Sequence, residues 1–111
     1  MDTRKLEPTH WQTYFDHVSR HLRASRVEIE VTGLDVGSQM VTSRIAIDGL
    51  TYDPEDDEVV ISAEQFEHHI AGPREIYVIE ELGQLSCFDV IDGDGHQQIV
   101  LLIPVELLPP R

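Results

Sequence analysis

From Val27 to Ile103 the chain is a series of short apolar runs, separated from one another by only a few turn residues. In the first run, Val27, Ile29 and Val31 alternate with polar residues, the period-two pattern of a strand with one dry face. Further strands are predicted over residues 39–47, 58–62, 66–70, 75–81, 85–91 and 97–103. Such short connections favour antiparallel neighbours, because a parallel pair needs a crossover of about a dozen residues. We predict a meander of six to seven strands, which can curl into a small barrel.

A different period precedes these runs. An apolar stripe recurs every three or four residues, at Trp11, Phe15, Val18 and Leu22. This spacing places the four side chains on one side of a helix. Thr9 and Gln12 form a capping-box pattern, so the helix is expected to begin near His10 and to end near residue 24. The chain therefore predicts an α+β fold, with one N-terminal amphipathic helix packed on a mostly antiparallel sheet.

The length of 111 residues suits one domain, because it is enough to bury one core and too short to divide into two. We expect a single domain over residues 1–111, with an irregular tail over residues 104–111, where three prolines stand. The N-terminus has no apolar segment behind its charges, and no run is long enough to span a membrane. These features predict a cytoplasmic protein without membrane contact.

The net charge of −13 is unevenly distributed. Residues 1–26 carry five bases and three acids, a charge of +2, whereas the other 85 residues carry three bases and eighteen acids, a charge of −15. A surface of this sign repels a phosphate backbone, so nucleic-acid binding is not expected. Cys87 is the only cysteine, which excludes an internal disulfide, and its strand-like setting predicts a buried structural thiol.

The densest acidic run is the candidate interaction site. It follows a tyrosine, and the residues nominated are Tyr52, Asp53, Glu55, Asp56, Asp57 and Glu58. One interpretation is a solvated turn, and the other is recognition of a basic protein surface, since clustered carboxylates on a loop steer association.

Two groups of histidines offer the ligand type of a metal site. His10, His17 and His21 flank the apolar helix stripe, and the last two are one turn apart, but no third ligand is identifiable. We interpret them as a solvated row, with a metal or pH-sensing role as the alternative. His68 and His69 are adjacent in a strand, so their rings should point to opposite faces, with one of them facing the core.

The segment Asp92-Gly93-Asp94-Gly95 has the look of a calcium loop. Aligning Gly95 to the invariant loop glycine puts Val90 and Leu101 where carboxylates are required, so the match fails. Asp-Gly pairs between apolar strands predict a hairpin turn instead. No metal ligand set, cofactor motif or nucleophile–base pair can be nominated, and we expect no metal and no cofactor.

Four motifs in order resemble one family. They are Trp11-x-x-Tyr14-Phe15, Gly49-x-x-Tyr52-Asp53-Pro54-x-Asp56-Asp57, His69-Ile70-x-x-Pro73 and Asp92-x-x-Gly95-x-x-Gln98-Ile99-Val100. From about Arg4 to Ile103 the chain resembles a family of small, uncharacterised bacterial proteins known as a domain of unknown function. The resemblance implies a bacterial cytosolic protein. It carries over no catalytic or binding residue.

Two function classes follow from these observations. The first is a non-catalytic protein-interaction or regulatory module that uses an acidic surface to meet a basic protein. The second is a small enzyme or small-molecule-binding domain, which would need a concave pocket with converging polar groups. The missing catalytic motif favours the first. A homo-oligomer is compatible with the sequence, but no feature of it predicts one.

Overall fold

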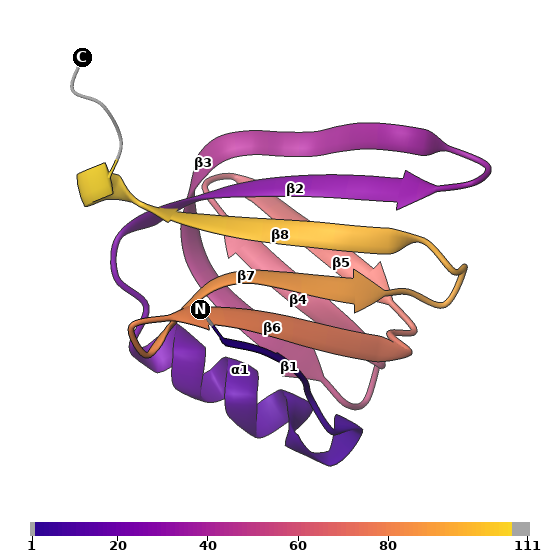
Figure 1. Cartoon of the computed structure of the whole chain (residues 1–111), viewed down its shortest axis with the longest axis horizontal. Coiled ribbons are helices and arrows are strands. Elements are labelled where there is room, and N and C mark those ends of the chain that lie inside the picture. Colours follow the sequence, from indigo (N-terminus) through magenta and orange to yellow (C-terminus); the bar gives the residue numbers. More distant parts are fainter. Residues whose placement is uncertain (1, 108–111) are drawn as a thin grey trace.

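The computed structural model describes residues 2–107, as one helix and eight strands with two short 3-10 turns (Figure 1). In chain order they are β1 (Asp2–Lys5), η1 (Pro8–His10), α1 (Trp11–Arg20), β2 (Ser25–Gly33), β3 (Gly37–Asp53), β4 (Glu58–Ala63), β5 (Phe66–Ala71), β6 (Glu75–Glu81), β7 (Gln84–Ile91), β8 (Gln97–Pro104) and η2 (Val105–Leu107). The α+β class, with one helix on an antiparallel sheet, is confirmed.

All strand pairs are antiparallel, and the strand order is β1-β6-β7-β8-β2-β3-β4-β5. The prediction of six to seven strands was wrong, because the described residues form eight; the strand that was not predicted is β1. β1 consists of Asp-Thr-Arg-Lys, which has no apolar residue to reveal a strand. It pairs with β6 at the sheet edge, where Arg4 contacts Glu80 and Lys5 contacts Glu75. A short, charged edge strand discourages pairing with other chains.

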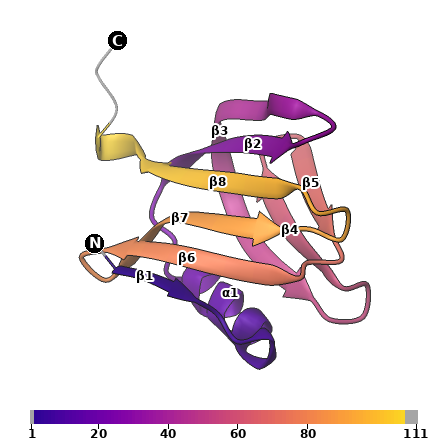
Figure 2. The same ribbon diagram turned by 45° about the vertical axis from the view of Figure 1, so that its right-hand side comes forward.

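β3 is far longer than predicted because it serves two layers. Its first part pairs with β2 as far as Ala46, and from Ile47 onward it pairs with β4, with a register irregularity between Ile47 and Gly49. We call β1, β6, β7, β8, β2 and the first part of β3 the front layer. Figure 2 shows β3 passing from the front layer to β4 and β5 behind it. The edge strands β1 and β5 do not pair with each other, so the prediction that the sheet can curl into a small barrel was wrong.

Helix α1 fills the open side between the layers. Ser19 Oγ accepts a hydrogen bond from the backbone N–H of Leu50 on β3, and a Cβ on Gly49 would lie 3.0 Å from that oxygen. The helix contacts β7 through Phe15 and Phe88, whose ring centroids are 5.1 Å apart. These contacts explain why a closing strand pair is absent from the described residues: the helix occupies the space.

The predicted helix face and the start near His10 are confirmed, whereas the capping and the far end are corrected. Trp11 and Phe15 are buried, while Val18 and Leu22 pack against the core. The capping box was wrong, because Thr9 lies in the η1 turn and no side chain caps the start of the helix. The helix ends at Arg20 rather than near residue 24, because His21, with φ −111° and ψ 15°, leaves the helical conformation; its N–H is shared between the carbonyls of His17 and Val18.

The core lies between the layers and is made by alternate residues of the strands. The largest fully buried side chains are Phe15, Phe88, Ile29, Leu50, Ile61, Ile70, Ile76, Val27, Val59, Val78, Val90 and Val100. Burial of a side chain of this size stabilises a fold by roughly 1.5–3 kcal/mol. Of the predicted irregular tail, Pro104 ends β8 and residues 105–107 form η2, while residues 108–111 lie outside the described part of the chain.

Candidate functional site

The acidic run is an ordered turn between β3 and β4. Its first two nominated residues, Tyr52 and Asp53, end β3, and Glu58 begins β4, so the loop is shorter than predicted. Asp53 Oδ1 accepts hydrogen bonds from the backbone N–H groups of Glu55 and Asp56, at 2.9 and 3.4 Å. The carboxylates of Glu55 and Asp56 are left exposed to solvent. Their role in binding stays a prediction.

Tyr52 anchors the far side of this turn. Its hydroxyl donates a 2.7 Å hydrogen bond to Asp57 Oδ1, and its ring meets Trp11 edge to face at 5.2 Å. Burial, together with the Asp57 carboxylate, raises the pKa of Tyr52 to about 12, so the hydroxyl remains a donor at neutral pH. Asp57 has a positive φ of 51°, a conformation that Asp and Asn tolerate better than most residues. Hydrogen bonds therefore join Tyr52 to Asp57 and Asp53 to the backbone of the turn.

Backbone hydrogen bonds hold three loops together at this end of the molecule. The N–H of Gly72 donates to the carbonyl of Asp57, and the N–H of Gly93 donates to the carbonyl of Ala71. Arg74 closes the junction by donating to the carbonyl of Gly93 at 2.6 Å. We call these three loops, residues 53–58, 71–74 and 92–96, together with the β2–β3 hairpin loop, residues 33–37, the acidic end; they lie at the right-hand side of Figure 1.

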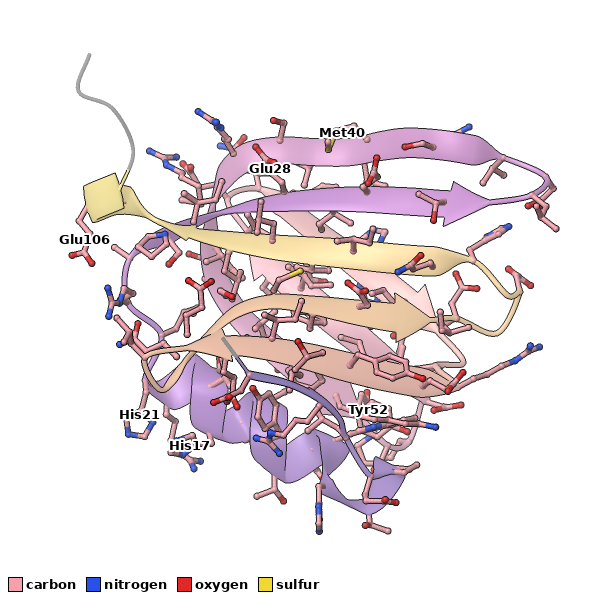
Figure 3. All side chains as sticks on the ribbon, in the orientation of Figure 1. His17, His21, Glu28, Met40, Tyr52 and Glu106 are labelled. Carbon is pink, nitrogen blue, oxygen red and sulfur yellow. The ribbon has the colours of Figure 1, made fainter. Side chains whose placement is uncertain are left out.

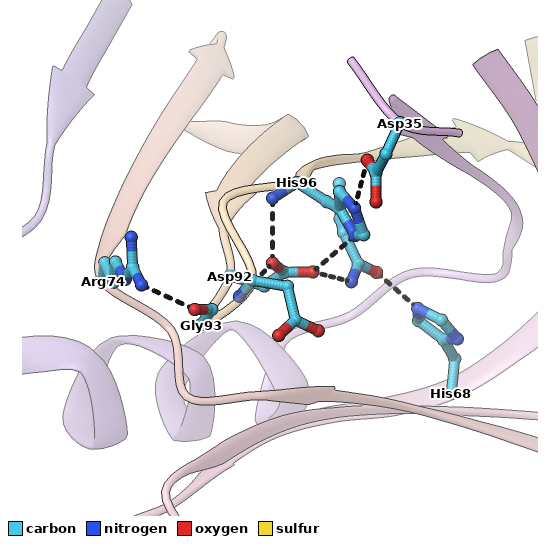
Figure 4. Close-up of polar contacts among 8 residues, drawn as sticks. Asp35, His68, Arg74, Asp92, Gly93 and His96 are labelled. Carbon is cyan, nitrogen blue, oxygen red and sulfur yellow. Dashed lines mark hydrogen bonds and ion pairs between the residues drawn. The ribbon is translucent and has the colours of Figure 1, made fainter. Parts of the chain in front are cut away.

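A buried carboxylate organises the β7–β8 hairpin (Figure 4). Asp92 Oδ1 accepts from the backbone N–H groups of Asp94 and His96, at 2.9 and 3.0 Å. Asp92 Oδ2 accepts from Gln98 Nε2 at 2.8 Å, and Gln98 in turn accepts a 2.6 Å hydrogen bond from His68 Nε2 on β5. The predicted hairpin turn is confirmed. The polar chain continues from the hairpin across the core to the second layer.

His96 joins this hairpin to the β2–β3 hairpin. Its Nε2–H donates to Asp35 Oδ1 at 2.8 Å, which raises the pKa of His96 and lowers the pKa of Asp35. The ring lies against Gly33, where an added Cβ would come within 2.5 Å of His96 Cδ2. Sequence reasoning missed this pair because Asp35 and His96 are 61 residues apart, and neither belongs to a recognisable spacing.

Three side chains of the same hairpin could hold a cation. Asp92, Asp94 and His96 each offer a ligand atom, and these atoms lie within 4.8 Å of one another. The Asp92 carboxylate already accepts three hydrogen bonds, so the hairpin is held without an ion. That the protein needs no metal stays a prediction.

The helix histidines remain at the surface. His10, His17 and His21 are all exposed. The rings of His17 and His21 lie 4.4 Å apart, and His21 Nδ1 is 3.0 Å from the carbonyl oxygen of His17 (Figure 3). Among residues 2–107 they join no group of three metal-ligating side chains.

The strand histidines point to opposite faces, as predicted. His68 faces inward onto Gln98, whereas His69 is exposed and contacts Glu58 at 2.9 Å and Glu67 at 3.3 Å. These two carboxylates raise the pKa of His69. His68 is thus the core-facing, hydrogen-bonded member of the pair.

The prediction that Cys87 is a buried thiol was wrong. Cys87 is half-buried on the outer face of β7 rather than buried in the core, because its neighbour Phe88 takes the inward position. Burial and the nearby carboxylate of Asp89 raise the pKa of the Cys87 thiol to about 11. A thiol with such a pKa is a poor nucleophile at neutral pH.

An open hollow of about 350 Å³ lies between β1 and the start of α1. Its lining residues are Arg4, Lys5, Leu6, Glu7, His10, Thr13 and Tyr14. Three of these side chains are already bound: Arg4 and Tyr14 contact the Glu80 carboxylate, and Lys5 pairs with Glu75. No nucleophile–base pair lines the hollow, so it lends no support to the enzyme alternative. Within residues 2–107, no helix has the length and apolar character needed to cross a membrane.

Comparisons with known proteins agree with the resemblance in the sequence. An uncharacterized protein of the bacterium Aquifex aeolicus (strain VF5) is 36% identical over 110 residues, covering 98% of this chain and 99% of the relative. No solved structure matches the chain. The model of a "Family of unknown function (DUF5335)" matches residues 2–111. The chain therefore belongs to the DUF5335 family, whose function is not established.

Proposed function

We propose that this protein is a non-catalytic binding module whose acidic end meets a basic surface on a partner protein. The observation that carries the proposal is the set of carboxylates without an ion pair on two loops of the acidic end, residues 53–58 and 92–96. Within residues 2–107, no lysine, arginine or histidine forms an ion pair with Asp53, Glu55, Asp56, Asp57 or Asp94. Such a group of like charges raises its own electrostatic energy, which a basic partner would lower.

The rigidity of the turn supports the same proposal. Asp53 holds the backbone of the loop, and Tyr52 holds the Asp57 carboxylate, so the backbone that carries the other carboxylates is ordered before any partner arrives. A preorganised surface loses little conformational entropy on binding. We further propose a cytoplasmic location, which the unpaired Cys87 favours, because cytosolic thiols are kept reduced.

The test compares two variants of equal charge. One replaces Asp53, Asp56 and Asp57 by Asn and Glu55 and Glu58 by Gln, which keeps the oxygen acceptors of the turn. The control replaces Asp2, Asp16, Asp48, Glu64 and Glu81, which lie outside the acidic end, by the matching amides. Each variant changes the net charge from −13 to −8, since five acids are neutralised.

Partners are first captured from native cell extract, and association rates are then measured at several salt concentrations. We expect the loop variant to associate more slowly than the control, and the wild-type rate to fall once the Debye length drops below about 10 Å. Equal rates for the two variants would remove the loop from the proposal. Turnover of any substrate would move the protein to the enzyme class.

A further inference from the structure

The outer face of the front layer carries an apolar patch in which Leu101 is 37% exposed and the other members are half-buried. In β6, β7 and β8 alternate residues point outward, and those that are apolar are Ile79, Cys87, Ile91, Ile99, Leu101 and Ile103. None of the six belongs to the core cluster or packs against it. Figure 3 looks onto this face, with β4 and β5 behind it. Among the described elements, α1 lies on the inner side, against β3.

The sequence of these strands suits burial on both faces. Residues 99–103 read Ile-Val-Leu-Leu-Ile, and in β6 the inward Ile76 and Val78 alternate with the outward Tyr77 and Ile79. A half-solvated strand normally alternates apolar with polar residues, whereas a continuous apolar run is typical of a strand with both faces covered. An apolar patch of this kind on one side of a sheet marks an interaction surface.

The register of the strands orders the charges around this patch. One cross-strand row runs Lys5, Tyr77, Asp89, Ile99, Glu30 across β1, β6, β7, β8 and β2. The next outward row runs Thr3, Ile79, Cys87, Leu101, Glu28 across the same strands. In the first row Lys5, which pairs with Glu75 within the protomer, stands at one end, and Glu30, which accepts a hydrogen bond from Ser38, stands at the other; each is two strands away from β7.

This order makes the face complementary to itself. We propose that it binds a second copy of the chain, face to face, about a two-fold axis that runs along β7. The rotation lays β1 of one protomer over β2 of the other, so that Lys5 meets the partner's Glu30. Ile79 then packs on the partner's Leu101, and Tyr77 on the partner's Ile99.

The charges at the two edges select the direction of the axis. An axis across the strands would stack β1 on β1 and β2 on β2, which brings lysine near lysine and glutamate near glutamate. An axis along β7 pairs opposite charges at both edges instead. Its cost is that Asp89 comes close to the partner's Asp89 in the middle, although Gln97 Nε2 donates a 3.0 Å hydrogen bond to each of these carboxylates.

The size of the face suits a dimer. Five strands at a spacing of about 4.8 Å and seven residues at a rise of about 3.3 Å give a projected area of roughly 550 Å². The solvent-accessible area of this face is larger than its projected area, because it follows the outline of the side chains. It is therefore comparable with the roughly 800 Å² that each partner buries in a standard interface. Aligned sheets pack about 10 Å apart, which leaves room for one interdigitated layer of side chains.

The first experiment measures the molecular mass of the full chain by sedimentation equilibrium over a range of concentrations. We expect a monomer–dimer equilibrium that Leu101→Arg shifts at least about tenfold toward monomer, because an arginine cannot pack against the partner's Ile79. Thr51→Arg, an exposed position on the other layer, is the control and should leave the equilibrium unchanged. Melting temperatures of both variants show that they fold. A wild-type protein that stays monomeric up to about millimolar concentration, or a dimer unaffected by Leu101→Arg, would overturn the proposal.

Charge exchange tests the pairing of the edges. Lys5→Glu and Glu30→Lys should each weaken the dimer, and the double variant should regain most of the loss, because the opposite charges meet again. Asp89→Asn should strengthen the dimer by removing the repulsion in the middle. Failure of the double variant to recover would contradict this arrangement.

Spin labels test the direction of the axis. In a Cys87→Ser background, Asp94→Cys carries one label on each β7–β8 hairpin. An axis along β7 puts both hairpins at the same end of the dimer, so the label separation should be close to the roughly 10 Å spacing of packed sheets, extended only by the labels themselves. An axis across the strands through the row of Lys5 and Asp89 would place the hairpins at opposite ends, roughly 33 Å apart along the strands, because Asp94 is five residues from Asp89. A separation of that size would exclude the proposed arrangement.

Discussion

The ring of Phe15 on α1 lies 5.1 Å from the ring of Phe88 on β7, tilted by 60°, and both side chains are fully buried. This contact ties the N-terminal helix to the middle of the front layer, across the sheet from the proposed dimer face. A tilted aromatic pair contributes about 0.5–1.5 kcal/mol beyond the area it buries. Phe15 is therefore the residue that most directly tests the fold.

Phe15→Ala should lower the free energy of unfolding by about 3–5 kcal/mol, because it leaves a cavity between the helix and the sheet. That is a large share of the roughly 5–15 kcal/mol that stabilise an ordinary domain. The measurement is the urea midpoint. Thr13→Ala, at an exposed position of the same helix, is the control and should stay within about 0.5 kcal/mol. A loss below about 1 kcal/mol for Phe15→Ala would mean that α1 is not packed as described.

Asp92→Ala should lower the free energy of unfolding by about 2–3 kcal/mol, because three donors lose their acceptor and Gln98 is buried. Asp92→Asn should cost less, since it keeps one acceptor oxygen for the hairpin backbone. Hydrogen exchange of the Asp94 and His96 amides reports the loss directly. Unchanged protection of both amides in Asp92→Ala would show that the carboxylate does not organise the hairpin.

Stability should decline as the pH rises from about 6 to about 8. The folded pKa of His96 lies above its ordinary value of about 6.5, so its contact with Asp35 stabilises most below that value, and the contribution is lost as the pH rises through the folded pKa. His69 acts in the same direction through Glu58 and Glu67. Asp35 contributes in the opposite pH range: its pKa is lowered by His96, so its contribution to stability is lost as the pH falls below about 4.

Urea midpoints at several pH values check this expectation. His96→Gln and His69→Gln should each show a smaller decline between about pH 6 and pH 8 than the wild type, because one titrating pair is removed. His10→Gln, at an exposed position without a described carboxylate contact, should follow the wild-type curve. Parallel curves for wild type and His96→Gln would show that the contact with Asp35 does not contribute.

Excess chelator should leave the melting temperature unchanged. The Asp92 carboxylate is engaged by three donors, and His17 and His21 have no third ligand among the described residues, so folding is expected to be independent of metal. Differential scanning calorimetry with and without EDTA is the measurement. A drop of several degrees, reversed by a divalent cation, would contradict this prediction.

Local patterns in the sequence were enough to locate the helix face, seven of the eight strands and the Asp92 hairpin. The spacing of Trp11 and Phe15, the alternation around Val27 and the Asp-Gly pairs each reflect the geometry of a few consecutive residues. The strand of Asp2–Lys5 has no such pattern, since only its pairing with β6 makes it a strand. The acidic run was recognisable for the same local reason, although its neighbours in space were not.

Only the tertiary structure decided which loops meet and which sheet face is left uncovered. The contacts of Asp35 with His96, and of His68 with Gln98, join residues 61 and 30 positions apart, and the chain holds no local sign of either. In the middle of β6, residues 76–79, and of β8, residues 99–103, both sets of alternate residues are apolar or aromatic, so alternation there cannot tell the core face from the outer one. The long β3 that bends between two layers, and the helix that fills the open side, settle that choice, because only one face of the front layer can pack against them.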